Sequence, residues 1–286
     1  MKRIMERTAA AAVFSLLVCP MIAGARPVNP ASGWLLDLEG GAGVVEQNLS
    51  GEPYFAVTSP LGWYDIQLDD LGERYVAVDQ SSGGVTLGLG YGWPAFYIQT
   101  LLGMRSANVR WDVEKLSTGA KKYEMEANGS GPAFGLRLGG RLWRGEKAAL
   151  HVNAFLLMAV MEDVTVNQTD VATGVSGEYL AGIPDFNMLS ADGGVDLTLS
   201  WTLGNFVPWA SVGSRAQSTS LGMKMDLLGT TTELQNFSVE ARSTFNPVLG
   251  ANWNFNRHGT LWLAGNLANP SGVMAGLTLC SGPRKG

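Results

Sequence analysis

Several segments of the chain alternate apolar residues with small or polar ones, at a period of two. The clearest, residues 84–93, reads GVTLGLGYGW, and the same period recurs in residues 134–142, 194–203 and 273–280. Successive side chains of a β-strand point to opposite faces of its sheet, so each segment has one apolar face and one face of glycine, threonine, serine and isolated charges. The pattern predicts an all-β protein.

The composition of the second face indicates which face is the inner one. In a soluble sandwich the apolar face forms the core, and the outer face is usually rich in Lys, Glu and Thr. Here the second face is dominated by the smallest side chains, which suits the crowded interior of a narrow barrel. We therefore expect the apolar face to contact lipid.

The connections between the expected strands have two lengths, which alternate along the chain. Short turns are expected at residues 93–94, 144–147, 204–205 and 256–259. Long polar loops are expected at about 46–82, 107–131, 163–190 and 215–243. Membrane barrels have this asymmetry, with short turns at one end and long loops at the other.

The expected fold is a closed antiparallel up-and-down transmembrane β-barrel of about ten strands, with both termini at the short-turn end. Residues 64–68 and 75–78 could add two strands, so twelve is the alternative count. The ten expected strands are residues 34–45, 83–93, 95–106, 132–143, 148–162, 191–203, 207–215, 243–255, 260–267 and 272–280.

Aromatic residues flank every short turn. Amphipathic rings are stabilised at a membrane interface, and membrane barrels carry girdles of them. The residues that we expect to form such a girdle are Trp34, Trp93, Trp143, Phe206, Trp209, Trp253, Phe255 and Trp262.

The N-terminal residues have the order of a secretory signal peptide. Lys2, Arg3 and Arg7 precede an apolar stretch at residues 8–19, and a small-residue triplet ends at Ala25. The apolar stretch is shorter than the roughly 20 residues that a membrane-spanning helix needs. We expect residues 1–25 to be a cleaved signal peptide and residues 26–286 to form one barrel domain.

Composition narrows the class of protein further. Charged residues make up 16% of the chain, against a typical ~25%. The net charge of −5 becomes −7 once residues 1–25 are removed, which argues against a nucleic-acid partner. Only Cys280 then remains, so an intrachain disulfide is not possible. The composition also fits a soluble secreted β-sandwich, which stays an alternative.

With these features the chain resembles the small outer-membrane β-barrel proteins of double-membraned bacteria, over residues 34–280. The resemblance is architectural and indicates no particular family. It implies an outer-membrane location, with membrane lipid, lipopolysaccharide and the outer-membrane assembly machinery as partners. One feature departs from it: many such proteins end on Phe or Trp, whereas the last strand here ends at Leu279-Cys280 and a polar tail follows.

Residues with catalytic chemistry are few. His151 is expected to point inward beside Asn153, and some outer-membrane phospholipases use a Ser, His and Asn set, but no Ser occupies the adjacent inward positions of this strand. The acidic pairs at residues 69–70 and 162–163, which an omptin-type protease would need, have no His nearby. No metal-ligand spacing occurs. We expect no enzyme, metal or cofactor, with a hydrolase using His151 as the remaining alternative.

A set of charged and polar residues is expected to face the lumen. Isolated buried ions are costly, so these groups must be paired or hydrated. They form either a network that plugs the lumen or the polar wall of a narrow pore. The expected function is a structural or cell-surface role, with long loops that reach an extracellular partner, and a narrow diffusion pore is the alternative. The residues are Asp37, Glu39, Arg105, Arg137, Arg141, His151 and Asp196.

Overall fold

A computed structural model describes residues 33–47, 54–59, 62–67, 73–179, 184–227, 230–267 and 271–282. These residues form antiparallel strands, and they include no helix that is long and apolar enough to cross a membrane. The strands are β1 (Gly33–Gln47), β2 (Tyr54–Ser59), β3 (Gly62–Gln67), β4 (Glu73–Gly92), β5 (Phe96–Lys115), β6 (Lys121–Arg144), β7 (Ala148–Asp170), β8 (Ser176–Glu178), β9 (Pro184–Trp201), β10 (Phe206–Leu227), β11 (Thr230–Asn254), β12 (Gly259–Asn266) and β13 (Ser271–Cys280).

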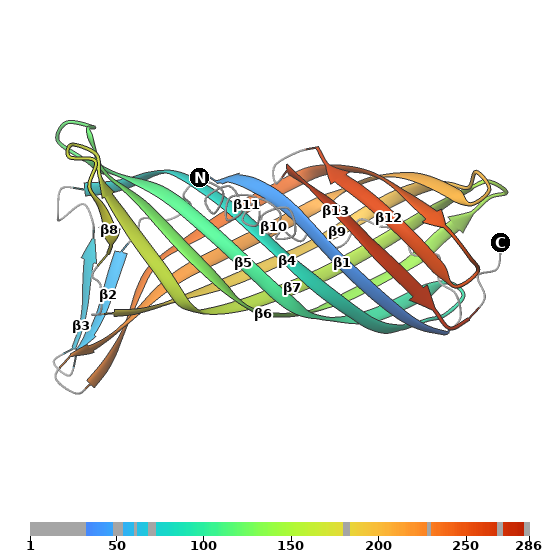
Figure 1. Ribbon diagram of the computed structural model, residues 1–286, viewed down its shortest axis with the longest axis horizontal. Coiled ribbons are helices and arrows are strands. Elements are labelled where there is room, and N and C mark those ends of the chain that lie inside the picture. Colours follow the sequence, from blue (N-terminus) through green and yellow to red (C-terminus); the bar gives the residue numbers. More distant parts are fainter. Residues whose placement is uncertain are drawn as a thin grey trace, which may run out of the picture.

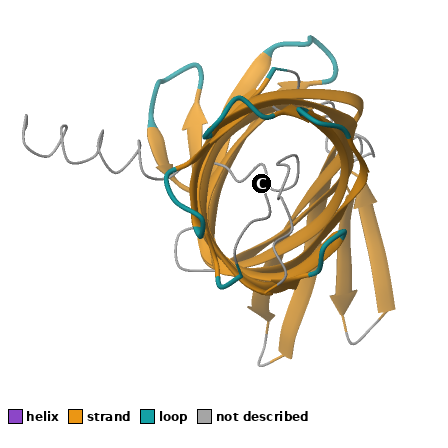
Figure 2. Cartoon of the chain, turned by 90° about the vertical axis from the view of Figure 1, so that its right-hand side faces the viewer, coloured by secondary structure: helices purple, strands orange, loops and turns teal. Residues whose placement is uncertain are grey.

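Ten of these strands close into a barrel (Figures 1 and 2). β1 pairs with β4 on one side and with β13 on the other, and β10 pairs with β11, so the ring has no free edge. The predicted count of ten strands is confirmed. The alternative count of twelve is wrong: the β2–β3 hairpin lies beside β11 outside the ring, and residues 75–78 belong to β4.

The outer face of the barrel carries a belt of exposed apolar side chains, as predicted. On β5 it includes Phe96, Ile98, Leu102 and Met104, each more than 40% exposed. The nine residues from the first to the last of these match the 9–11 residues with which a tilted strand crosses a bilayer. β5 thus presents to lipid one membrane thickness of apolar surface.

The segments predicted as long loops are for the most part strand, which corrects that expectation. β5 continues to Lys115 and β6 starts at Lys121, so the loop expected at 107–131 shrinks to residues 116–120. Similarly, β10 and β11 leave only residues 228–229 between them. The strands can continue beyond the membrane because the backbone N–H and C=O groups of paired strands bond to one another in water as well as in lipid.

The polarity of the two faces reverses where the strands leave the belt. Beyond residue 106 of β5, the inward side chains Val109, Trp111 and Val113 are apolar and buried, whereas Asn108 and Arg110 point outward. We call this part the outer barrel: residues 107–115 of β5, 121–130 of β6, 164–170 of β7 and 184–190 of β9. It lies at the left of Figure 1 and has an apolar core of the kind found in a soluble protein.

Six of the eight expected girdle aromatics are exposed at the short-turn end: Trp34, Trp93, Trp143, Phe206, Trp253 and Phe255. Ring contacts link some of them, and the Trp93 and Phe96 rings stack with their centroids 4.4 Å apart. Trp201, which was not expected, is exposed at the same end.

Trp209 and Trp262 were expected in the girdle, and this is wrong. Both point into the barrel, where they are 2% and 5% exposed. Glycine on the neighbouring strands makes room for them: a Cβ on Gly250 would overlap the Trp209 ring, and one on Gly276 would lie 2.6 Å from Cζ2 of Trp262. The Trp209 indole N–H donates to Oδ1 of Asn252 at 3.1 Å, which satisfies the buried donor.

Candidate functional site

Two clusters of charged side chains fill the middle of the barrel. In the first, Arg137 of β6 contacts Glu39 of β1, and its Nη1 lies 3.8 Å from Oδ2 of Asp37. Gln99 of β5 donates to the same Asp37 oxygen at 2.7 Å. A Cβ on Gly88 would lie 3.2 Å from Cβ of Asp37, so glycine at this position makes room for the cluster.

The second cluster joins β5, β9 and β10. Arg215 donates from Nε to Oδ1 of Asp192 at 2.9 Å and contacts the other carboxylate oxygen through Nη2. Nη2 of Arg105 lies 3.8 Å from Oδ2 of Asp192 and donates to Oγ of Ser82 at 3.3 Å. The Arg215 guanidinium also lies over the Phe155 ring, 5.7 Å from its centroid.

Sequence reasoning missed Asp192 and Arg215. Both lie at the ends of predicted strands, beyond which the alternation of apolar and polar residues is no longer regular. The signal was nevertheless present, because Asp192 is four residues from Asp196 and therefore on the same face of the strand.

Of the remaining predicted lumen charges, Asp196 interacts electrostatically with Arg215 of the second cluster, and Arg141 lies apart from both clusters. Asp196 is buried and faces Gly213 of β10, and a Cβ on that glycine would overlap its carboxylate. Arg141 lies at the short-turn end, partly exposed, and donates to the backbone oxygen of Pro94 at 3.0 Å. It therefore belongs to the rim of the barrel and to neither cluster.

His151 contacts a serine from the neighbouring strand β9, which the sequence of its own strand β7 does not predict. Its Nε2 lies 3.3 Å from Oγ of Ser200, which β9 supplies from the position paired with Ala149. Asn153 accepts from the Tyr97 hydroxyl at 3.1 Å and donates to Thr198 at 3.3 Å. The Ser and His components of a nucleophile–base pair are thus adjacent, and Asn153 bonds to other partners.

Of the acidic pairs considered for protease chemistry, the structure describes the side chain of Glu162 alone. Residues 69–70 lie outside the described part of the chain. Glu162 is exposed on the outward face of β7. On the described residues, neither pair forms a site with His151.

The interior is closed at the level of the two clusters. Asp37, Gln99, Leu101 and Leu157 are fully buried, and Arg105 is 1% exposed. Among the described residues, side chains from several strands therefore pack against one another at this level and leave no wide aqueous channel between them.

Solved structures with a similar fold are bacterial outer-membrane proteins. The outer membrane protease OmpT of Escherichia coli aligns with a TM-score of 0.50 and 9% identity, over 89% of this chain and 99% of that one. The translocator domain of the autotransporter NalP of Neisseria meningitidis has a TM-score of 0.44 and 16% identity, over 97% and 95%. OprG of Pseudomonas aeruginosa has a TM-score of 0.41 and 12% identity, over 88% and 97%.

These identities are low, so the similarity concerns the fold. No protein-family model matches the chain, and no curated protein matches it either. With its closed ring of ten antiparallel strands and its apolar outer belt, the chain is by fold an outer-membrane β-barrel protein.

Proposed function

We propose that this protein is a closed barrel that is exported by a cleaved signal peptide, resides in the outer membrane and presents its outer barrel to the cell exterior as an interaction surface. The observation that carries the proposal is the pair of buried charge clusters. Arg137 of β6 is paired with Asp37 and Glu39 of β1, and Arg105 of β5 is paired with Asp192 of β9, so both clusters join strands that are not neighbours in the ring. Arg215 of β10, the neighbour of β9, completes the second cluster. A barrel filled in this way serves as an anchor.

The outward face of the outer barrel supports the second half of the proposal. Arg110 pairs with Glu126 at 2.9 Å, and Lys121 pairs with Asp112 at 2.8 Å. Hydrogen bonds from Asn108 and Arg110 lower the pKa of Glu126, so its carboxylate stays ionised at neutral pH. A charged face of this kind suits contact with a polar extracellular partner or lipopolysaccharide.

Planar-bilayer recording tests whether the barrel is closed. We expect the purified chain to give no stepwise conductance. Stepwise openings above leak in the unmodified protein would contradict the proposal, and the narrow diffusion pore would replace it.

Cysteine labelling tests which end is outside. Cys280 is buried, so single substitutions Arg110→Cys and Lys147→Cys each add one exposed thiol, at opposite ends of the barrel. A membrane-impermeant maleimide should label Arg110→Cys in intact cells, and label Lys147→Cys only after the outer membrane is permeabilised. The reverse pattern would contradict the proposed orientation.

The Ser200–His151 contact favours a hydrolase as a second candidate function. A Ser nucleophile needs a base within hydrogen-bond reach, and 3.3 Å is close to that range. In this case His151→Ala and Ser200→Ala should each abolish fatty-acid release from phospholipid vesicles. Absence of such release from the unmodified protein, or activity that survives both substitutions, would eliminate this candidate.

A further inference from the structure

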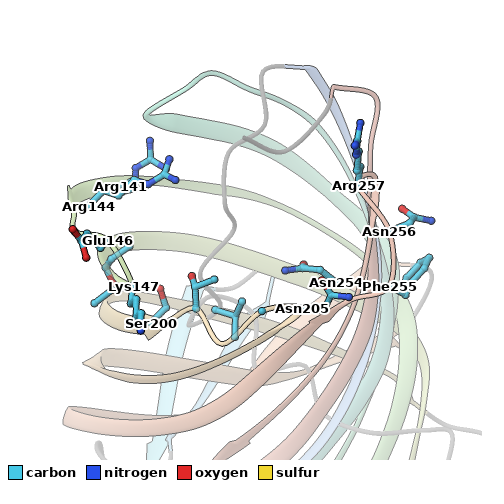
Figure 3. A pocket seen from close by; sticks show the side chains of 16 residues that line it. Arg141, Arg144, Glu146, Lys147, Ser200, Asn205, Asn254, Phe255, Asn256 and Arg257 are labelled. Carbon is cyan, nitrogen blue, oxygen red and sulfur yellow. Dashed lines mark hydrogen bonds between the residues drawn. The ribbon is translucent and has the colours of Figure 1, made fainter. Parts of the chain in front are cut away.

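The short-turn end of the barrel encloses a pocket of about 350 Å³ between the turns that join β6 to β7, β9 to β10 and β11 to β12 (Figure 3). Four of its lining side chains are basic, namely Arg141, Arg144, Lys147 and Arg257, and one is acidic, Glu146. This excess of positive charge occurs in a chain whose formal net charge is −5. The pocket is therefore an electropositive site on an acidic protein.

The turns that carry these basic residues are tied to one another through the backbone. The Thr202 N–H donates to the Lys147 oxygen at 2.7 Å, and the Asn254 N–H donates to the Asn205 oxygen at 2.8 Å. The Arg141 guanidinium is held by the Pro94 oxygen at 3.0 Å. Because these bonds already order the turns, a ligand would have to order the exposed side chains of Lys147 and Arg257 but not the backbone that carries them.

We propose that this pocket binds a phosphate-bearing anion. Guanidinium groups hold phosphate oxygens through paired N–H donors, and Lys147 adds a point charge. The Asn256 side chain on the pocket wall accepts from the His258 and Gly259 N–H groups through Oδ1, and its amide N–H groups supply neutral donors for the remaining oxygens. The volume suits a small group such as a phosphomonoester or a lipid headgroup.

Glu146 should oppose anion binding, and its replacement therefore provides a second test of the proposal. Its carboxylate shares the pocket with the four cations and repels an anion there. Replacing it by glutamine should therefore tighten binding. A variant that is merely less stable would not give that result.

Calorimetric titration of the detergent-solubilised full chain tests the proposal, with inorganic phosphate and glycerol 3-phosphate as probes at constant ionic strength. We expect saturable binding by the unmodified protein, at least tenfold weaker binding by Arg141→Gln/Arg257→Gln, and binding a few-fold tighter by Glu146→Gln. Thr100→Ala, on the exposed face of β5 and outside the pocket, should bind as the unmodified protein does. A heat-modifiable gel shift verifies that each variant is folded.

A second experiment distinguishes a soluble phosphate compound from a lipid headgroup as the natural ligand. In nanodiscs of phosphatidylcholine the unmodified protein should bind the soluble probes, and if the natural ligand is a solute it should still bind them when the lipid is phosphatidylglycerol. If the ligand is a lipid headgroup, phosphatidylglycerol in the nanodisc should abolish binding of the soluble probes in the unmodified chain. Absence of binding to every probe, or equal binding by Arg141→Gln/Arg257→Gln and the unmodified protein, would overturn the proposal.

Discussion

Loss of Arg137 should strongly destabilise the barrel. Arg137→Gln leaves Asp37 and Glu39 buried, 0% and 6% exposed, without their cation. Breaking one side of a buried ion pair costs about 3–5 kcal/mol, because the remaining charge is neither solvated nor paired. The equilibrium constant for unfolding should therefore rise by roughly two to three and a half orders of magnitude.

The double substitution Arg137→Gln/Glu39→Gln distinguishes this explanation from loss of packing. It removes both charges of the closest pair and leaves Asp37 bonded to Gln99. We expect the double variant to recover at least half of the stability that Arg137→Gln loses. Arg110→Gln is the matched control, since its guanidinium pairs with Glu126 on the outside and is 66% exposed, and it should cost less than about 1 kcal/mol.

Urea unfolding in lipid vesicles, followed by tryptophan fluorescence, measures five proteins: the unmodified chain, Arg137→Gln, Glu39→Gln, the double variant and Arg110→Gln. The reasoning about the cluster would be refuted if the effects of the two single substitutions simply add in the double variant. Equal destabilisation by Arg137→Gln and Arg110→Gln would refute it as well.

Three further substitutions test the fold in the same unfolding assay. Leu102→Arg places a charge in the apolar belt and should cost about 2–4 kcal/mol; a cost near zero would mean that this face does not contact lipid. Trp111→Ala empties part of the outer barrel core and should cost about 3–5 kcal/mol, whereas a surface loop would tolerate it. Gly250→Val should displace the Trp209 ring and shift its fluorescence, and an unchanged spectrum would argue against the inward ring.

The closed ring of strands could be predicted from the sequence because the alternation is strong wherever one face meets lipid. The outer barrel could not, since its outward positions are polar, whereas those of the belt are apolar. On β5 the exposed apolar side chains stand at even positions up to Met104, and the apolar side chains stand at odd positions from Ala107 to Val113, although no residue is inserted between the two parts. A change of phase in hydrophobicity predicts the end of a strand, whereas β5 continues through it.

The interior contacts depend on which strands are neighbours, and a single strand does not contain that information. Ser200 reaches His151 only because β9 pairs with β7 in a particular register. For Trp209 a local signal did exist. It shares its phase with Ser211 and Gly213, the small residues typical of the inner face.

The reversal of polarity along β5 also fixes how deeply the barrel sits in its bilayer. Each residue advances the strand by about 3.3 Å, and Met104 and Arg110 are only six residues apart. If the barrel sank toward the short-turn side, Arg110 would enter hydrocarbon, and if it rose, Leu102 and Met104 would enter water. Since neither displacement is favourable, a thicker or thinner membrane has to adjust its own thickness around this protein.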